Sequence, residues 1–231
     1  MPVQQVAAPL TRVVLPHLVR HRDDPAAFSA AVARGQLVLA TLLLGALSAI
    51  AATAPSLTAV ALGPGWGEAV PLIRALCLAS ALQALQYVYY WILLAHGRTE
   101  VLFGAELGAR IAMIALMLVA APFGAIWVAL AAAAGQALLL VSNIALVGPR
   151  LQIAARPLLL QAARPVAVFG TACALTWAAS TQLPSWPALP TLLVLLAGWA
   201  AACAATLLAP PVRRDAAALV TYCRSVIGRS G

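Results

Sequence analysis

The chain has 231 residues, of which 64% are hydrophobic and only 9% are charged. Soluble domains are about 45–50% apolar and about 25% charged, and disordered chains are poor in apolar residues, so both classes are excluded. An integral membrane protein remains, with a formal net charge of +8 in which all 14 basic residues are Arg.

The first 35 residues are predicted to form a cytoplasmic segment that combines the remnant of a preceding span with the start of a helix. This segment is not a secretory signal, because it lacks a short apolar core with a small-residue cleavage site. Asp24 and Pro25 predict a helix start, since Asp caps helix N-termini and Pro is favoured at the first helical position. We expect this helix to run through Gly35 into the first span.

Six stretches reach the length of about 20 apolar residues that a helix needs to cross a bilayer. Gly- and Pro-rich turns separate them, and they are too long and too uniformly apolar for barrel strands. The sequence therefore predicts an all-α, polytopic membrane helix bundle over 36–210, followed by a basic cytoplasmic tail over 211–231. The predicted spans are roughly 36–61, 71–95, 101–121, 124–147, 165–182 and 189–209.

The placement of Arg predicts the orientation of the bundle. Twelve of the 14 Arg residues lie before the first span, in the loops after spans two and four, or in the tail, and none lies in the other three loops. Cytoplasmic loops are enriched in Arg, so both termini are predicted to be cytoplasmic. The basic residues form no folded patch, which argues against binding of nucleic acid.

A stripe of polar residues follows the second span. Gln83, Gln86, Tyr87 and Tyr90 are spaced to share one helix face. They could form interhelical hydrogen bonds, worth about 0.6 kcal/mol each in membranes, or line a cavity for a hydroxyl-rich solute. Taken as a set, the stripe favours a cavity. The fourth span adds two residues that share a face, Gln136 and Asn143.

The third span carries two ionisable residues, Glu106 and Arg110, one helical turn apart. Each costs about 2.5–3.5 kcal/mol to insert at the centre of a membrane helix, so each is expected to have a structural or functional role. They could form an internal ion pair that neutralises itself, or Glu106 could position Arg110 as an anion-binding group. Both alternatives turn this face away from lipid. Gly104 and Gly108, on the opposite face, predict close contact with a neighbouring helix.

Arg74, near the outer end of the second span, is expected to extend to the surface or to pair with Glu68, and alternatively to line an exit. The sequence has no nucleotide-binding fingerprint, nucleophile elbow, CxxC or metal-ligand spacing of His. Its outer loops hold a single acidic residue. We therefore expect no enzyme, no cofactor and no metal.

Several motifs occur in a moderately specific order and spacing as far as residue 160. They are the run from Pro2 to Pro25, Leu62–Trp66 with Ala69–Arg74, Leu93–Thr99 with its Gly-Arg pair, and Pro122–Ala129. This series resembles the bacterial polysaccharide exporters, which are lipid-linked oligosaccharide flippases of the MOP (multidrug/oligosaccharidyl-lipid/polysaccharide) superfamily. Val19 departs from the family, which usually has Ser there.

The resemblance implies a substrate, a partner and a location. Family members have twelve to fourteen spans in two lobes, and this chain resembles the last six of fourteen, with Met1 inside the eighth. The implied substrate is an undecaprenyl-diphosphate-linked glycan, moved across the bacterial cytoplasmic (inner) membrane for lipopolysaccharide or exopolysaccharide biosynthesis. Arg110 with Glu106 would receive the diphosphate, and the polar stripe would contact sugar hydroxyls. Implied partners are the bilayer and a missing N-terminal half, a homodimer partner or polysaccharide assembly proteins.

Three other functions stay open. The chain could be a structural or interaction protein that transports nothing, or a drug/cation antiporter of the same superfamily. An antiporter would favour an acidic residue at the midplane without a basic partner, whereas Glu106 has Arg110 one turn away. A membrane-embedded enzyme is disfavoured by the scarcity of acid/base residues in the outer loops.

Overall fold

The computed structural model describes residues 2–151, 155–183 and 186–217. Within these ranges every regular element is a helix, which confirms the predicted all-α fold. The elements are α1 (Pro2–Arg20), α2 (Pro25–Ala61), η1 (Pro64–Trp66), α3 (Ala69–Ala95), α4 (Thr99–Ala120), η2 (Ala121–Phe123), α5 (Ala125–Leu151), α6 (Ala155–Ser180) and α7 (Ala188–Thr206).

Six helices of the described chain are long and apolar enough to cross a membrane, as predicted. The first of them, α2, has 37 residues and is about 55 Å long at 1.5 Å per residue. The hydrocarbon core of a bilayer is only about 30 Å thick, so α2 extends well beyond it. The membrane segments are Pro25–Ala61, Ala69–Ala95, Thr99–Phe123, Ala125–Ala145, Leu158–Ser180 and Ala188–Thr206.

The predicted start of α2 is confirmed in atomic detail. The Asp24 carboxylate accepts hydrogen bonds from the backbone N–H groups of Ala26 and Ala27, at 3.0 and 3.1 Å. Pro25 occupies the first turn, where its missing N–H group has no cost. The cap therefore ends the turn after α1 and fixes where α2 begins.

Replacing Asp24 with Ala is expected to lower the free energy of unfolding by about 1 kcal/mol, because two N–H groups lose their acceptor. Thermal unfolding of the purified chain in detergent measures this change. Asp23→Ala is the matched control, since the Asp23 side chain is 95% exposed and its contact with Arg22 is 3.6 Å long. Equal destabilisation by the two variants would contradict the capping role.

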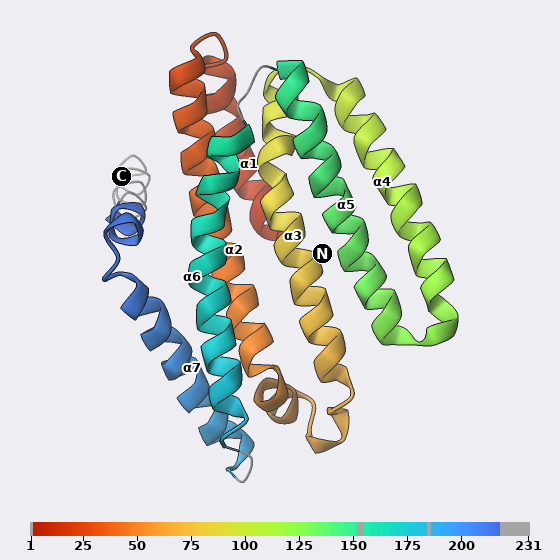
Figure 1. Cartoon of the computed structure of the whole chain (residues 1–231), viewed down its shortest axis with the longest axis vertical. Coiled ribbons are helices and arrows are strands. Elements are labelled where there is room, and N and C mark those ends of the chain that lie inside the picture. The colour runs from red at the N-terminus through yellow and green to blue at the C-terminus, as the bar shows by residue number, and fades with distance from the viewer. Residues whose placement is uncertain (1, 152–154, 184–185, 218–231) are drawn as a thin grey trace.

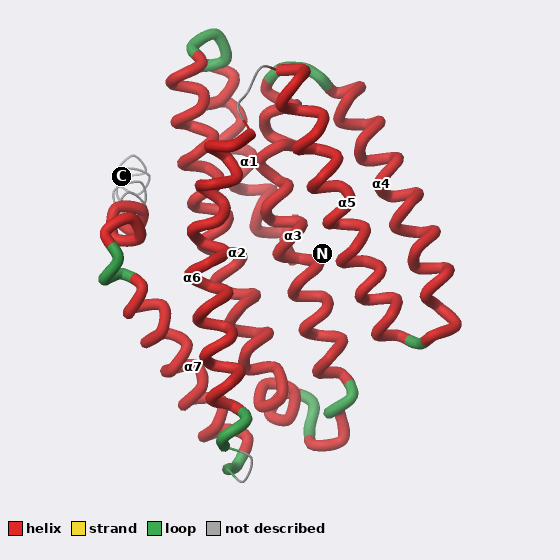
Figure 2. The backbone as a smooth tube through the Cα atoms, in the orientation of Figure 1, coloured by secondary structure: helices red, strands yellow, loops and turns green. Residues whose placement is uncertain are grey.

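The helices form a central pair with a wing on each side. In Figure 1, α2 and α3 lie in the centre, α4 and α5 extend from α3, and α6 and α7 extend from α2. The turns at 21–24 and 96–98 lie at one end, and those at 62–68, 121–124 and 181–183 lie at the other (Figure 2). We call the first the Arg-rich end, because its turns contain Arg22 and Arg98 and the described turns of the other end contain no Arg.

Helix α1 packs into the bundle beside α2 and α3. Its residues Val3, Ala7, Val14 and Leu18 are buried in the same apolar core as Trp91 of α3. The Trp91 indole N–H donates to the Thr11 hydroxyl at 2.8 Å, and that hydroxyl donates to the carbonyl of Ala7. Residues 2–20 therefore form a wall of the bundle and not a free segment.

The predicted contact at Gly104 and Gly108 is wrong within this chain. Both residues are exposed, and a Cβ atom added at either would meet nothing within 4 Å. The close approach between α4 and α5 occurs instead at Gly135, which packs on Met113. In the predicted tail, residues 211–217 are helical and 218–231 lie outside the described residues.

Candidate functional site

A pocket of about 500 Å³ opens between α1, α3, α4 and α5. We call it the polar pocket. It contains seven of the eight side chains that the sequence proposes as a cavity lining, all except Gln136. Its walls are formed by Gln4, Gln83, Gln86, Tyr87, Tyr90, Thr99, Leu102, Phe103, Glu106, Arg110 and Asn143.

The wall from α3 is the predicted polar stripe. Gln83 and Gln86 are buried, whereas Tyr87 and Tyr90 are half-buried with ring centroids 5.6 Å apart. Residues spaced three and four apart meet on one side of a helix, so the regular geometry of α3 is enough to bring the four together. The stripe gives the pocket two amides and two phenol groups from a single rigid element.

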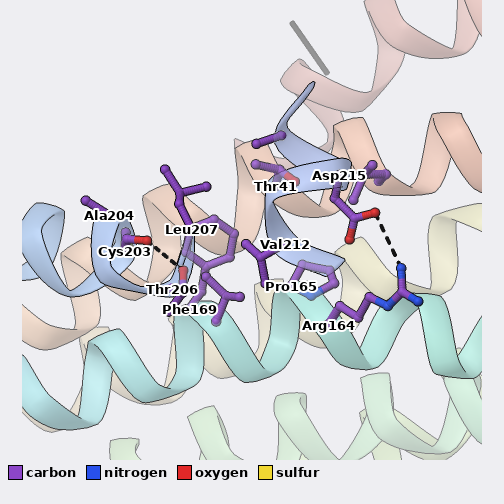
Figure 3. Close-up of a pocket in the computed structure, with 13 residues that line it drawn as sticks. Thr41, Arg164, Pro165, Phe169, Cys203, Ala204, Thr206, Leu207, Val212 and Asp215 are labelled. Atoms are coloured by element: carbon purple, nitrogen blue, oxygen red, sulfur yellow. Dashed lines mark hydrogen bonds and ion pairs between the residues drawn. The ribbon is translucent and has the colours of Figure 1, made fainter. Parts of the chain in front are cut away.

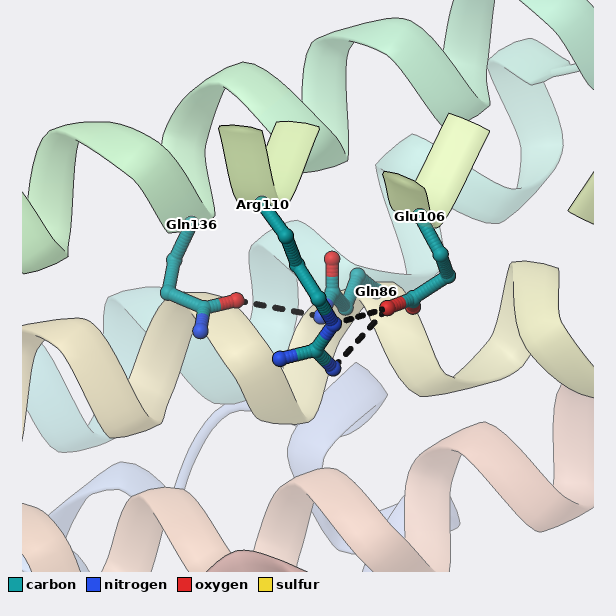
Figure 4. A network of polar contacts seen from close by, with 4 residues as sticks. All are labelled: Gln86, Glu106, Arg110 and Gln136. Atoms are coloured by element: carbon teal, nitrogen blue, oxygen red, sulfur yellow. Dashed lines mark hydrogen bonds and ion pairs between the residues drawn. The ribbon is translucent and has the colours of Figure 1, made fainter. Parts of the chain in front are cut away.

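The wall from α4 carries the charges. The Arg110 Nε atom donates to Glu106 Oε2 at 3.0 Å, and Nη2 lies 2.9 Å from the same oxygen (Figure 4). The Arg110 side chain is 53% exposed and that of Glu106 is 27% exposed. Arg110 and Glu106 therefore form the ion pair that the first alternative predicted. Much of the guanidinium nevertheless stays accessible, which binding of an anion, the second alternative, requires.

Gln136 of α5 lies behind the wall and does not line the pocket. Its Oε1 accepts a hydrogen bond of 3.1 Å from Gln86 Nε2, where α3 and α5 pack together (Figure 4). The shared face of Gln136 and Asn143 suggested that both would line a cavity, but the contact with Gln86 uses the Gln136 side chain. Its role in this arrangement is to orient Gln86.

Two buried acceptors of this site have no hydrogen-bond partner among the described residues. They are Gln86 Oε1 and Asn143 Oδ1, and the Asn143 side chain is almost completely buried. Buried polar atoms are nearly always hydrogen-bonded in folded proteins. Two acceptors without a donor at the same pocket therefore need an explanation. Both oxygens lie beneath the pocket surface, so a ligand hydroxyl would reach them only if the two amide groups turned.

Removing the Gln86–Gln136 hydrogen bond is expected to have a small effect on stability. Gln136→Leu should lower the free energy of unfolding by about 0.6 kcal/mol, the average for such bonds in membrane proteins. A double-mutant cycle with Gln86→Leu, followed by unfolding in detergent, measures the coupling. A coupling near zero would contradict a direct interaction between the two amides.

Four residues of the pocket are missing from the sequence-based prediction. Gln4 was not proposed because α1 was expected to lie outside the six-helix bundle, and Thr99 because it was assigned to a loop. Leu102 and Phe103 are apolar residues in an apolar span, so no pattern distinguishes them. The polar character of Gln4 and Thr99 was the only available signal.

Arg74 does not pair with Glu68 as one alternative suggested. Its Nε atom donates to the carbonyl of Ala51 in α2 at 3.2 Å, and its guanidinium lies 5.7 Å from the ring centroid of Trp177 in α6. Arg74 therefore turns into the bundle, away from the polar pocket. No group of three potential metal-binding side chains gathers anywhere in the described ranges.

Comparison with known proteins gives one match. Residues 1–71 match the model of a family described as a polysaccharide biosynthesis protein. No curated protein matches, and no solved structure matches. The match covers α1, α2, η1 and the start of α3. Of the pocket lining that the structure describes, only Gln4 lies inside the match. With the six apolar helices, the match supports a multi-pass membrane protein related to polysaccharide biosynthesis.

Proposed function

We propose that this chain takes part in moving a lipid-linked oligosaccharide or polysaccharide precursor across the bacterial inner membrane, as a flippase of the MOP superfamily or its C-terminal portion. The observation that carries the proposal is the polar pocket, in which one accessible cation lies among amide and hydroxyl groups inside a bundle of membrane helices. The Arg-rich end would face the cytoplasm. Helix α1 reaches this end at Arg20, whereas Pro2 lies about 27 Å away along the helix, at the depth of the polar pocket.

The pocket suits a ligand that has both charge and hydroxyl groups. The Arg110 guanidinium can donate to a phosphate oxygen, and Glu106 holds it in place from one side. The exposed amide of Gln4 can bind sugar hydroxyls, and Tyr87 and Tyr90 offer hydroxyls of their own. A volume of about 500 Å³ holds the diphosphate and the first sugars, and the rest of a longer glycan would extend outside.

The open side of the polar pocket implies a partner. Arg110 lies roughly 16 Å along α4 from Thr99, near the middle of a membrane-spanning helix. A charged side chain at that depth is costly if it faces lipid, and this one is about half exposed. A second lobe, a second copy or a polysaccharide assembly protein would cover it. The close pairing with Glu106 makes a drug/cation antiporter less suitable, because the carboxylate already has a cation.

A binding experiment tests the proposed substrate class. The full chain in phosphatidylcholine nanodiscs is titrated with an undecaprenyl-diphosphate-linked disaccharide and, separately, with undecaprenol, which has the same tail without the charge or the sugars. We expect the diphosphate glycolipid to bind at least about tenfold more tightly, corresponding to about 1.4 kcal/mol. Equal affinities would overturn the proposal, because the tail alone would then account for binding.

A further inference from the structure

A second pocket lies on the other wing of the molecule, between α2, α6, α7 and the helical residues 210–217 (Figure 3). Its volume is about 310 Å³, and we call it the apolar pocket. Most of its lining consists of aliphatic and aromatic side chains, among them Leu37, Val168, Phe169, Leu207 and Val212. It shares no residue with the polar pocket.

The floor of the apolar pocket is held in place by specific contacts. Phe169 packs over Gly45, where an added Cβ atom would come within 3.3 Å of the ring. The Phe169 ring stacks on Trp199, with centroids 6.3 Å apart, and the Trp199 indole N–H donates to the Ser48 hydroxyl at 3.0 Å. This network fixes the ring of Phe169, so the pocket is built into the packing of α2, α6 and α7.

The interior offers little to a polar ligand. The hydroxyl of Thr206 already donates to the carbonyl of Cys203 at 2.6 Å. A polar solute would lose its hydration in this pocket and regain few hydrogen bonds, which is costly. An alkyl chain loses nothing, and a bilayer surrounds the pocket with alkyl chains at very high concentration.

The mouth of the apolar pocket is charged. Arg164 of α6 lies 3.4 Å from the Asp215 carboxylate, in an ion pair that joins α6 to the segment after α7. Arg213 and Arg214 directly precede Asp215 and are exposed. Arg164 and Asp215 balance each other in charge, and Arg213 and Arg214, on the outer faces of the same helical segment, make the surface beside the mouth positive. Basic clusters between membrane helices attract the head groups of anionic lipids.

We propose that the apolar pocket binds an acyl chain of an anionic phospholipid from the leaflet at the Arg-rich end. The chain lies against Phe169 and Leu207, and the head group lies against Arg213, Arg214 and the exposed part of Arg164. This lipid is distinct from the proposed transport substrate and occupies different helices. The lipid site can therefore be tested independently of the function proposed for the polar pocket.

Photo-crosslinking of the full chain tests the acyl-chain site. Nanodiscs contain phosphatidylglycerol with a diazirine on one acyl chain, and labelled peptides are identified by mass spectrometry. Ala204 lines the pocket and its neighbour Ala205 does not, so Ala204→Phe is compared with Ala205→Phe. We expect labelling of α6 and α7 at the pocket to fall about tenfold in Ala204→Phe only. The Phe ring would fill the pocket, so several methylene groups of the acyl chain could no longer be buried there.

A second matched pair covers the case in which Ala204→Phe does not fold. Leu207 lines the pocket, whereas the neighbouring Leu208 is 87% exposed, so Leu207→Trp should reduce labelling and Leu208→Trp should not. Equal labelling in the folded pocket variants and their controls would overturn the proposal. The labelling would then come from the lipid that surrounds any membrane protein and not from a specific site.

The head-group preference is tested by comparing phosphatidylglycerol with phosphatidylcholine that carries the same diazirine chain. We expect wild-type protein to favour phosphatidylglycerol severalfold, and the double variant Arg213→Gln/Arg214→Gln to lose most of that preference. The double variant Arg20→Gln/Arg22→Gln is the charge-matched control, because both residues are exposed at the same end of the bundle. No preference in wild-type protein, or one that survives the double variant, would overturn the assignment of an anionic lipid.

Discussion

Arg110→Ala is expected to abolish export while leaving membrane insertion intact. Hydrogen bonds to charged groups contribute about 1.5–3 kcal/mol, so the affinity for an undecaprenyl-diphosphate-linked glycan should fall about 10–100-fold. Membrane insertion should be unaffected, because placing Ala inside a bilayer costs less free energy than placing Arg there. Binding is measured in nanodiscs, and export is measured as surface polysaccharide in a bacterium that depends on the gene carrying this sequence.

Two further variants separate the charge of Arg110 from its geometry. Arg110→Lys keeps the cation but loses the two-pronged contact with Glu106, so it should retain part of the affinity. Arg20→Gln removes an exposed Arg at the end of α1 and should leave binding unchanged. Normal surface polysaccharide with an inserted Arg110→Ala protein would contradict the proposed role of the polar pocket.

Gly135→Val is expected to be the most destabilising of the glycine variants. A Cβ atom at Gly135 would lie 2.6 Å from the Met113 Cβ atom, closer than real side chains approach, so α4 and α5 would have to separate. Overpacking of this kind costs about 1–3 kcal/mol. Met113 lies one turn beyond Arg110 on α4, so the displaced helix should also bind the glycolipid more weakly. Unfolding in detergent and nanodisc binding measure the two effects.

Gly104→Val and Gly108→Val are the matched controls for Gly135→Val. Both lie on α4 in open space, so each should change the free energy of unfolding by less than about 0.5 kcal/mol. A larger loss at Gly108 than at Gly135 would show that the exposed face of α4 packs on something in the folded protein, and that the contact expected from the sequence exists between molecules.

The parts of the fold that local patterns determine were predictable. Six apolar stretches gave six helices, and Asp24 with Pro25 gave the start of α2, because length, hydropathy and capping are local properties. The same holds for the two walls of the polar pocket. The α3 stripe and the Glu106–Arg110 pair each follow from helical periodicity within a single element.

The relations between helices were not predictable in the same way. Gly104, Gly108 and Gly135 all lie in apolar helices, and only the neighbours decide which of them allows a close approach. Gln136 shares a face with Asn143, but the packing of α5 on α3 places the Gln136 side chain within hydrogen-bonding distance of Gln86. The contribution of α1 depended on the burial of Val3 and Ala7 against α3, and that packing has no signature in residues 1–35 alone.

The hydrogen bond between Gln86 and Gln136 has a mechanical consequence. Helices α4 and α5 form a hairpin that carries both charges of the polar pocket, and this is the side-chain hydrogen bond that the described residues form between the hairpin and α3. The turn before the hairpin contains Gly97 in a left-handed conformation, with φ at 66°. A movement of the hairpin that widened the pocket would have to break this bond and also separate the packed faces of α3 and α5, so packing is expected to resist opening more than the bond does.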